Sequence, residues 1–391
     1  MQETDKEIFE KDAKDYLPVF NRYKIVLDHG EGAYLWDNNG KKYLDFLGGI
    51  AVNVLGHDYG PLVTAISEQA KKLIHCSNLY YTQPQADAAA KLVALSGLDK
   101  AFFGNSGAEA NEGAIKIARK YAHQIDPEKS QIITAWDSFH GRTIATLTAT
   151  GQPKYHEGFG PLPDGFDYVH YNDIEELESM MSEKTAAVML ETIQGEGGVH
   201  PLDKDFFEGV NKYAKEHDIL LIVDEVQTGN GRTGKLYGYM NFDVQPDIVS
   251  TAKGLGGGLP IGATMLSEKT QDVFTYGTHG STFGGNPIAC AGAVSILKEI
   301  DDALLASVKE KGDYIKKEME GSKGVKSVAG MGLMLGIEPV APVGPIVEKL
   351  LAKGVVVLTA KEKIRLLPAL NIPMEQLKKA VAIMKDVLAE E

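Results

Sequence analysis

Residues 219–225, Ile-Leu-Leu-Ile-Val-Asp-Glu, and residues 247–258, Asp-Ile-Val-Ser-Thr-Ala-Lys-Gly-Leu-Gly-Gly-Gly, decide the fold. Each is a short apolar run that ends in polar residues, a pattern typical of strands buried on both faces. Two similar runs cover residues 131–135 and 186–190, and a helical pattern covers 205–217. Strands that alternate with helices predict an α/β fold with a mostly parallel sheet covered by helices on both faces.

The flanking sequence extends this pattern. Helical periodicity continues through residues 61–74 and 86–96, and Asn38-Asn39-Gly40 separates two apolar runs, which is a hairpin signal. Beyond residue 330, short apolar runs and the amphipathic stretch Met374–Leu388 predict a smaller α/β unit.

These patterns give three expected segments. We expect an N-terminal arm with short strands over residues 1–56, belonging to the small domain, then a large domain over 57–290 that contains the parallel strands. A C-terminal small domain would follow over 291–391.

The composition excludes several classes of protein. The 391 residues carry 40 basic and 54 acidic side chains, a net charge of −14, which argues against nucleic-acid and anionic-membrane partners. Apolar residues at 43% exclude intrinsic disorder. Only Cys76 and Cys290 occur, so neither a disulfide framework nor a cysteine-based zinc site is expected. Because residues 1–18 are densely charged and no apolar stretch is long enough to span a bilayer, we expect a cytoplasmic protein.

Polar residues follow four of the predicted strands. Asp224 and Glu225 end one strand, Lys253 follows another, Glu191 ends a third, and residues 136–142, Trp-Asp-Ser-Phe-His-Gly-Arg, follow a fourth. Any one of them alone could be a solvated loop residue or a helix cap. Ligands of open α/β sheets bind at the carboxyl ends of the strands, so the four together predict one site.

A fifth segment, residues 102–112, opens a helix with glycines and Ser106. Free backbone N–H groups at such a helix start can bind phosphate. A plain serine N-cap followed by acidic residues in the first turn explains the same segment equally well.

Together these residues suit pyridoxal phosphate. Its chemistry needs a lysine amine to form a Schiff base, a carboxylate against the pyridine nitrogen, a flat apolar group over the ring and an arginine for a substrate carboxylate. Lys253, Asp224, Phe139 and Arg142 supply these groups.

The competing motifs are weaker. Residues 229–234, Gly-Asn-Gly-Arg-Thr-Gly, match the dinucleotide pattern G-x-G-x-x-G, but no amphipathic helix follows them. No phosphate-binding P-loop or hydrolase nucleophile elbow occurs. The ten histidines lack metal-ligand spacing, so we expect no metal, and His57 and His140 are expected to be packed or hydrogen-bonded.

Several ordered motifs closely resemble the class-III aminotransferases, and within them the acetylornithine and succinylornithine aminotransferases. These motifs are residues 105–112, 139–142, 224–234 and 252–262, and the resemblance extends from Gly32 to Pro368. The resemblance implies the type-I fold of pyridoxal-phosphate transferases, a large domain plus a smaller α/β domain.

The resemblance also implies roles for cofactor-binding residues. Lys253 would carry the cofactor and shuttle a proton, and Asp224 would pair with the pyridine nitrogen. Gln227 would bond the phenolic oxygen, with Val226 and Phe139 on the two ring faces. Ser106, Gly107 and Ala108 would hold the phosphate, and Thr282 would reach the phosphate of a second subunit, which implies a homodimer with shared sites.

The implied reaction moves the δ-amino group of an N-acylornithine to 2-oxoglutarate, within arginine biosynthesis. Arg142 and Ser281 would contact the acylornithine, and Arg365 would bind the α-carboxylate of glutamate or 2-oxoglutarate, with Glu196 as its gate. A structural Glu196–Arg365 ion pair is the alternative for those two residues. Three other functions are open. The protein could be a class-III aminotransferase that acts on ornithine, 4-aminobutyrate or another ω-amine. It could also be a nicotinamide dehydrogenase, or a non-catalytic protein that binds a cofactor.

Overall fold

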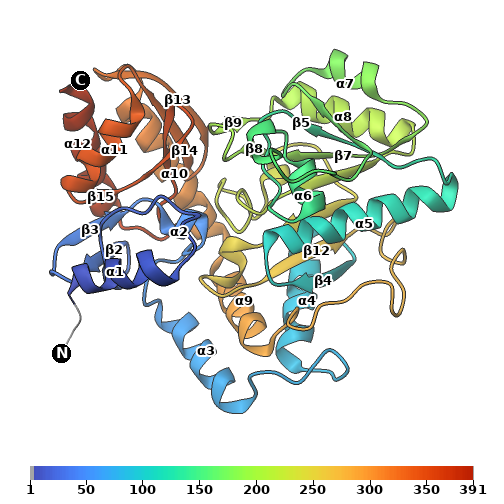
Figure 1. Ribbon diagram of the computed structural model, residues 1–391, viewed down its shortest axis with the longest axis horizontal. Coiled ribbons are helices and arrows are strands. Elements are labelled where there is room, and N and C mark those ends of the chain that lie inside the picture. Colours follow the sequence, from blue (N-terminus) through green and yellow to red (C-terminus); the bar gives the residue numbers. More distant parts are fainter. Residues whose placement is uncertain (1–3, 391) are drawn as a thin grey trace.

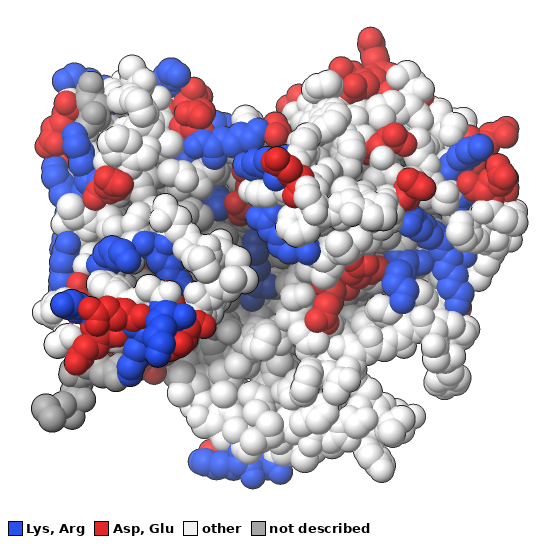
Figure 2. Space-filling view, in the orientation of Figure 1, with Lys and Arg blue, Asp and Glu red and all other residues white. Residues whose placement is uncertain are grey.

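The computed structural model describes residues 4–390 and has two lobes with a cleft between them (Figures 1 and 2). The larger lobe is built on a seven-stranded sheet with strand order β4-β12-β11-β10-β7-β5-β6. The strands are β4 (Lys100–Gly104), β5 (Gln131–Ala135), β6 (Phe166–Val169), β7 (Thr185–Glu191), β10 (Leu220–Asp224), β11 (Ile248–Thr251) and β12 (Gly262–Leu266). Only β12 runs antiparallel to its neighbours, so the predicted mostly parallel sheet is confirmed.

Alternate residues of the central strands enter two separate cores. Ile222 and Met189 pack with α5 (Gly107–Ile125), whereas Val223 and Leu190 belong to the core that contains Phe207 of α8 (Lys204–Glu216). Because both faces of the sheet are covered, both faces of each strand must be apolar. This is why the strands read as unbroken apolar runs.

Further helices complete the large lobe (Figure 1). They are α3 (Gly60–Lys72), α4 (Gln83–Ser96), α6 (Ile144–Ala149), α7 (Ile174–Met180) and α9 (Pro287–Glu299). Short 3-10 turns cover Pro153–Tyr155, Gly238–Asn241 and Lys253–Gly256, and a small hairpin pairs β8 (Ile193–Gln194) with β9 (His200–Pro201).

The smaller lobe combines both ends of the described chain. Its antiparallel sheet has the order β13-β14-β17-β16, formed by Val325–Met331, Met334–Pro339, Lys363–Leu366 and Leu358–Ala360. Helices α10 (Asp302–Met319), α11 (Val343–Ala352) and α12 (Met374–Ala389) accompany it.

The N-terminal segment joins this lobe through a second sheet. After α1 (Asp5–Asp15), strands β1 (Leu27–Glu31), β2 (Tyr34–Asp37) and β3 (Lys42–Asp45) form an antiparallel ribbon, and β3 pairs with β15 (Val355–Val356). The predicted hairpin at Asn38-Asn39-Gly40 connects β2 and β3, with Gly40 at a φ of +77°. The short α2 (Gly48–Ala51) then leads toward the large lobe.

Candidate active site

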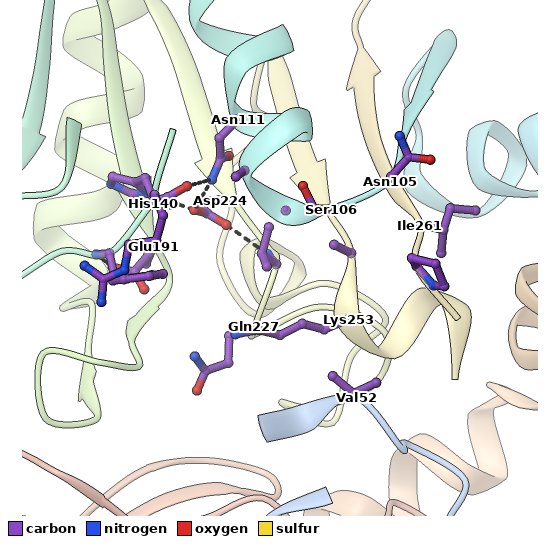
Figure 3. A pocket seen from close by; sticks show the side chains of 18 of the residues that line it. Val52, Asn105, Ser106, Asn111, His140, Glu191, Asp224, Gln227, Lys253 and Ile261 are labelled. Carbon is purple, nitrogen blue, oxygen red and sulfur yellow. Dashed lines mark hydrogen bonds and ion pairs between the residues drawn. The ribbon is translucent and has the colours of Figure 1, made fainter. Parts of the chain in front are cut away.

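A cavity of about 480 Å³ lies at the carboxyl edge of the large sheet (Figure 3). Its walls come from the predicted strand ends and the start of α5, so the structure brings those separate segments together. The residues that line it are Val52, Asn105, Ser106, Gly107, Ala108, Asn111, Phe139, His140, Gly141, Arg142, Glu191, Asp224, Val226, Gln227, Ala252, Lys253, Gly258, Leu259, Pro260 and Ile261.

Asp224, at the end of β10, is held by three neighbours. Its Oδ2 accepts a hydrogen bond from Asn111 Nδ2 and lies 2.8 Å from His140 Nδ1, and its Oδ1 accepts from the Val226 N–H at 2.9 Å. Burial disfavours the charged His140 ring, but the bond to Asp224 outweighs it and raises the pKa of His140. Asp224 is therefore a fixed carboxylate backed by a histidine, and His140 is hydrogen-bonded as expected.

Lys253 begins the turn after β11. Its φ is +45°, a left-handed conformation that costs a non-glycine residue on the order of 1 kcal/mol and is concentrated at functional sites. Burial lowers the pKa of its amine below the ordinary 10.5, against the charge of Glu196, which raises it. The lowered pKa favours the neutral amine, which is the form that attacks a carbonyl carbon.

The start of α5 forms one wall of the cavity. Ser106 is the N-cap, and its Oγ accepts a hydrogen bond from the Glu109 N–H at 3.1 Å. The serine-cap interpretation is thus correct. It does not compete with phosphate binding, because the first N–H groups of a helix have no partner within it. At Gly107 a Cβ would lie 2.6 Å from Val226, so only glycine allows this close approach.

Glu191 connects two walls of the site. Its Oε2 accepts the Phe139 N–H at 3.1 Å, and its Oε1 accepts the Gly195 N–H at 3.3 Å. Burial raises the pKa of Glu191 to about 7. The sequence placed Glu191 at a strand end but gave it no role, and it gave none to Asn111, although both belong to the segments singled out.

The two arginines assigned to substrate lie in different surroundings. Arg142 is exposed at the cavity wall, with its guanidinium 3.8 Å from the centre of the Tyr155 ring. Arg365, on β17, is fully buried, and its Nη1 donates to Glu196 Oε1 at 2.6 Å and to Gln227 Oε1 at 3.0 Å. Burial opposes ionisation of Glu196, but the Arg365 charge prevails and lowers the pKa of Glu196.

Glu196 and Arg365 do not line the main cavity; they adjoin it through Gln227. Ser281 and Thr282 also lie outside it and line a neighbouring hollow. Asn105 lines both, and its Nδ2 donates to Ser281 Oγ at 3.1 Å. Within one chain, the predicted site residues thus form three neighbouring groups: the main cavity, the adjoining Glu196–Arg365 ion pair, and the hollow lined by Ser281 and Thr282.

The residues present fit pyridoxal phosphate. The partly buried Lys253 side chain and the fixed Asp224 carboxylate line the same cavity, as do Val226 and Phe139, which can cover a flat ring. At the start of α5, Gly107 lets the backbone lie against Val226, and the first N–H groups of the helix line the same cavity. Within residues 4–390, no cluster of histidine, cysteine, aspartate or glutamate has the arrangement of a metal site.

The fold and the cavity fit an enzyme that holds a phosphorylated, ring-shaped cofactor. Residues 18–388 match the family described as Aminotransferase class-III, and the chain belongs to this family. It is therefore a pyridoxal-phosphate-dependent aminotransferase, as the sequence motifs predicted.

Known relatives extend over the same length. The chain is 49% identical to an acetylornithine aminotransferase of Caldanaerobacter subterraneus subsp. tengcongensis, covering 96% of this chain and 98% of the relative. It is 47% identical to that of Methanocaldococcus jannaschii, covering 96% of each.

Solved structures show the same fold. The acetylornithine aminotransferase of Elizabethkingia anophelis superposes with a TM-score of 0.89 at 35% identity, covering 100% of both chains. The ornithine aminotransferase of Toxoplasma gondii ME49 superposes with a TM-score of 0.95 at 31% identity, covering 100% of this chain and 96% of the other. Among the helices of residues 4–390, none is long and apolar enough to cross a membrane.

Proposed function

We propose that this enzyme transfers the δ-amino group of an N-acylornithine, acetyl or succinyl, to 2-oxoglutarate, giving the acylglutamate semialdehyde and glutamate in arginine biosynthesis. The observation that carries the proposal is the contrast between the two arginines: one is exposed at the cavity wall, and the other is buried and covered by an acid. Both substrates carry an α-carboxylate, but the acylornithine reacts at its distant δ-amine and 2-oxoglutarate at the carbon next to that carboxylate, so the two carboxylates need two such positions. The high identity to acetylornithine aminotransferases supports this choice of donor.

Lys253, Asp224, Val226, Gln227, Phe139 and residues 106–108 would hold the cofactor. When bound, pyridoxal phosphate supplies an aldehyde carbon for amine exchange and a ring that accepts electrons. The fixed Asp224 carboxylate would keep the ring nitrogen protonated, because the negative charge between Asn111 and His140 favours a cation opposite it. Lys253 Nζ would take up and return the proton at the amine-bearing carbon of the substrate, as its lowered pKa permits.

For the substrates, Arg142 and Ser281 would contact the acylornithine. Arg365 would take the α-carboxylate of 2-oxoglutarate or glutamate after releasing Glu196, and the ion pair would re-form when the acylornithine enters. The closed pair lets an uncharged part of the first substrate pass without facing an unpaired guanidinium.

A homodimer would complete the site. Exposed apolar side chains gather around the segment between α3 and α4: Ile74 (60% exposed), Leu79 (87%), Tyr80 (68%), Tyr81 (104%) and Phe283 (60%). The Asn78 side chain donates to the carbonyls of Ser281 and Gly284, so this segment and the Thr282 loop form one surface. Figure 2 shows few charged side chains over the lower part of this lobe. A second copy seated there would bring Thr282 toward its partner's phosphate cradle.

We further propose the domain boundaries at 56/57 and 290/291, with the N-terminal arm in the small domain, as the pairing of β3 with β15 supports. Helix α9 crosses the second boundary. Both cysteines are free thiols in the structure, which supports a cytoplasmic location.

Substitution of Lys253 by alanine tests the central role. We expect the variant to fold, to lose the visible absorbance of the lysine-bound cofactor and to lose turnover by about a thousandfold or more. Wild-type kinetics with N-acetylornithine, N-succinylornithine and ornithine side by side test the donor. Retained turnover in the variant, or a clear wild-type preference for free ornithine, would contradict the proposal.

A further inference from the structure

The glycine-rich loop at residues 229–234, which resembled a dinucleotide motif, lies buried between the two lobes. It follows β10 and the cavity residues Asp224, Val226 and Gln227. No bound dinucleotide is needed to explain its glycines. Gly231 has a φ of +90°, which favours glycine, and a Cβ there would lie 2.9 Å from Leu370 of the small lobe, so backbone conformation and the packing of the two lobes explain this glycine.

Arg232 is the centre of this loop. It is among the largest side chains with no exposed surface. Its Nη1 donates to the carbonyl of Leu333 at 3.1 Å and to the carbonyl of Pro368 at 2.5 Å. Its own carbonyl accepts the Leu333 N–H at 3.0 Å. Arg232 therefore binds two separate segments of the small lobe.

Both segments are next to Arg365. Pro368 follows Arg365 by three residues, and Leu333 directly precedes β14, which pairs with β17 so that Gly336 lies opposite Arg365. The same loop also reaches the cofactor lysine. Asn230 Nδ2 donates to the Ala252 carbonyl at 3.1 Å, one residue before Lys253. The loop thus connects the lysine with the strand that carries the carboxylate-binding arginine.

The burial of the Arg232 guanidinium costs free energy. Arg232 Nε and Nη2 find no hydrogen-bond partner within the described residues, and a buried guanidinium without full pairing is destabilising. Burial lowers the pKa of Arg232 to about 9, and the charge of Asp45 is what supports its cationic form. A well-packed apolar residue would stabilise the lobe contact at lower cost. Such an apolar residue could not hold two backbone carbonyls at fixed positions, because it has no hydrogen-bond donor.

We propose that Arg232 is a positioning residue that sets the place of Arg365 relative to Lys253, and thereby the affinity for the dicarboxylate substrate. The inference rests on the proposed carboxylate-binding role of Arg365. Arg232 touches neither substrate nor cofactor, and acts by holding the ends of β17 and β14 against the loop that follows Asp224. A displacement on the order of 1 Å at such a group can cost up to about a hundredfold in rate.

The test uses the holoenzyme with Arg232→Met, which keeps an unbranched apolar stem, although a shorter one, and removes the donors, and Arg232→Lys, which keeps a charge and a single donor group. Enzyme loaded with the cofactor's amine form is mixed with 2-oxoglutarate, and the donor half-reaction is measured separately. We expect the KM for 2-oxoglutarate to rise by about tenfold in Arg232→Met, equivalent to about 1.4 kcal/mol, and by less in Arg232→Lys. The donor half-reaction and the cofactor absorbance should stay near the wild-type values.

Arg119→Met is the matched control, since Arg119 Nη2 also donates to a backbone carbonyl, that of Asp164, but at the far side of the large lobe. It should leave both half-reactions unchanged. Equal losses in both half-reactions, or an unchanged KM for 2-oxoglutarate in either folded Arg232 variant, would overturn the inference. Because any accepted amine can load the enzyme, failure of N-acylornithine as donor would count against the proposed function alone.

Discussion

Removal of the Glu196 carboxylate should make the enzyme bind 2-oxoglutarate more tightly and discriminate less between its amino donors. In the structure Glu196 Oε1 accepts from Arg365 Nη1 at 2.6 Å, and the Arg365 side chain has no exposed surface. A substrate carboxylate that binds Arg365 must first displace this acid. In Glu196→Ala only the neutral Gln227 oxygen, 3.0 Å away, still competes for the guanidinium.

The expected change in the KM for 2-oxoglutarate follows from the strength of the hydrogen bond between Glu196 and Arg365. A hydrogen bond between charged partners contributes about 1.5–3 kcal/mol, and each 1.4 kcal/mol is a tenfold change in affinity. Glu196 is 29% exposed, which places the pair toward the lower end of that range. We therefore expect the KM for 2-oxoglutarate to fall by about tenfold in Glu196→Ala, and by less in Glu196→Gln, which keeps a neutral acceptor.

The assay is steady-state kinetics of both half-reactions. Glutamate should become a better competitor of the acylornithine as amino donor, because its α-carboxylate finds Arg365 uncovered. Glu318→Ala serves as control: Glu318 is 34% exposed and pairs with Lys385 at 3.0 Å between α10 and α12. An unchanged or increased KM for 2-oxoglutarate in Glu196→Ala would refute the gate and leave a structural ion pair.

Three further predictions address the carboxylate, the pH dependence and the core. Asp224→Asn should lower kcat by about a hundredfold or more while the cofactor stays bound, because the ring nitrogen loses its charged partner. Burial raises the pKa of Glu225 to about 7, so the folded state holds a proton that the unfolded chain releases near pH 4.5. Stability should therefore fall as pH rises from about 4.5 through 7, and Glu225→Gln should flatten this slope in thermal melts. Phe207→Ala should destabilise the protein by about 3–5 kcal/mol in denaturant titrations, because its ring is fully buried edge-on to Phe242.

Each of these has an outcome that contradicts it. Full activity in Asp224→Asn would mean that another group holds the ring nitrogen. A pH slope that persists in Glu225→Gln would assign the titration to other groups, with Glu191 as the first to examine. A loss below about 1 kcal/mol in Phe207→Ala would mean that the α8 side of the core collapses into the space left by the ring.

Much of the cofactor site could be predicted without coordinates. The strands that end at Glu191, Asp224 and near Lys253 are apolar on both faces, and this pattern alone predicts parallel strands whose carboxyl ends meet. Local chemistry also marks the start of α5, because Ser106 and its glycine neighbour favour an N-cap.

Other parts of the site depend on contacts between distant segments. Asn111 lies 113 residues from Asp224, and Glu196 lies 169 residues from Arg365, yet each pair is joined by a hydrogen bond. No local pattern encodes such a pairing: the family resemblance implied the Glu196–Arg365 pair, which the structure shows, and nothing in the sequence indicated the Asn111–Asp224 bond. Tertiary packing also places Ser281 and Thr282 in a hollow beside the main cavity. It likewise lets Glu191 connect the loops of Phe139 and Gly195.

The amino-acid sequence by itself determined the strand and helix pattern, the family and the reactive residue types, because burial periodicity and short motifs are properties of neighbouring residues. Only the tertiary structure decided how the two lobes meet. Arg232 reads in the sequence as part of a glycine-rich nucleotide-like loop, whereas in the fold it is a buried donor to the carbonyls of Leu333 and Pro368. The difference arises because a guanidinium can serve a ligand or the backbone, and only three-dimensional proximity selects between them.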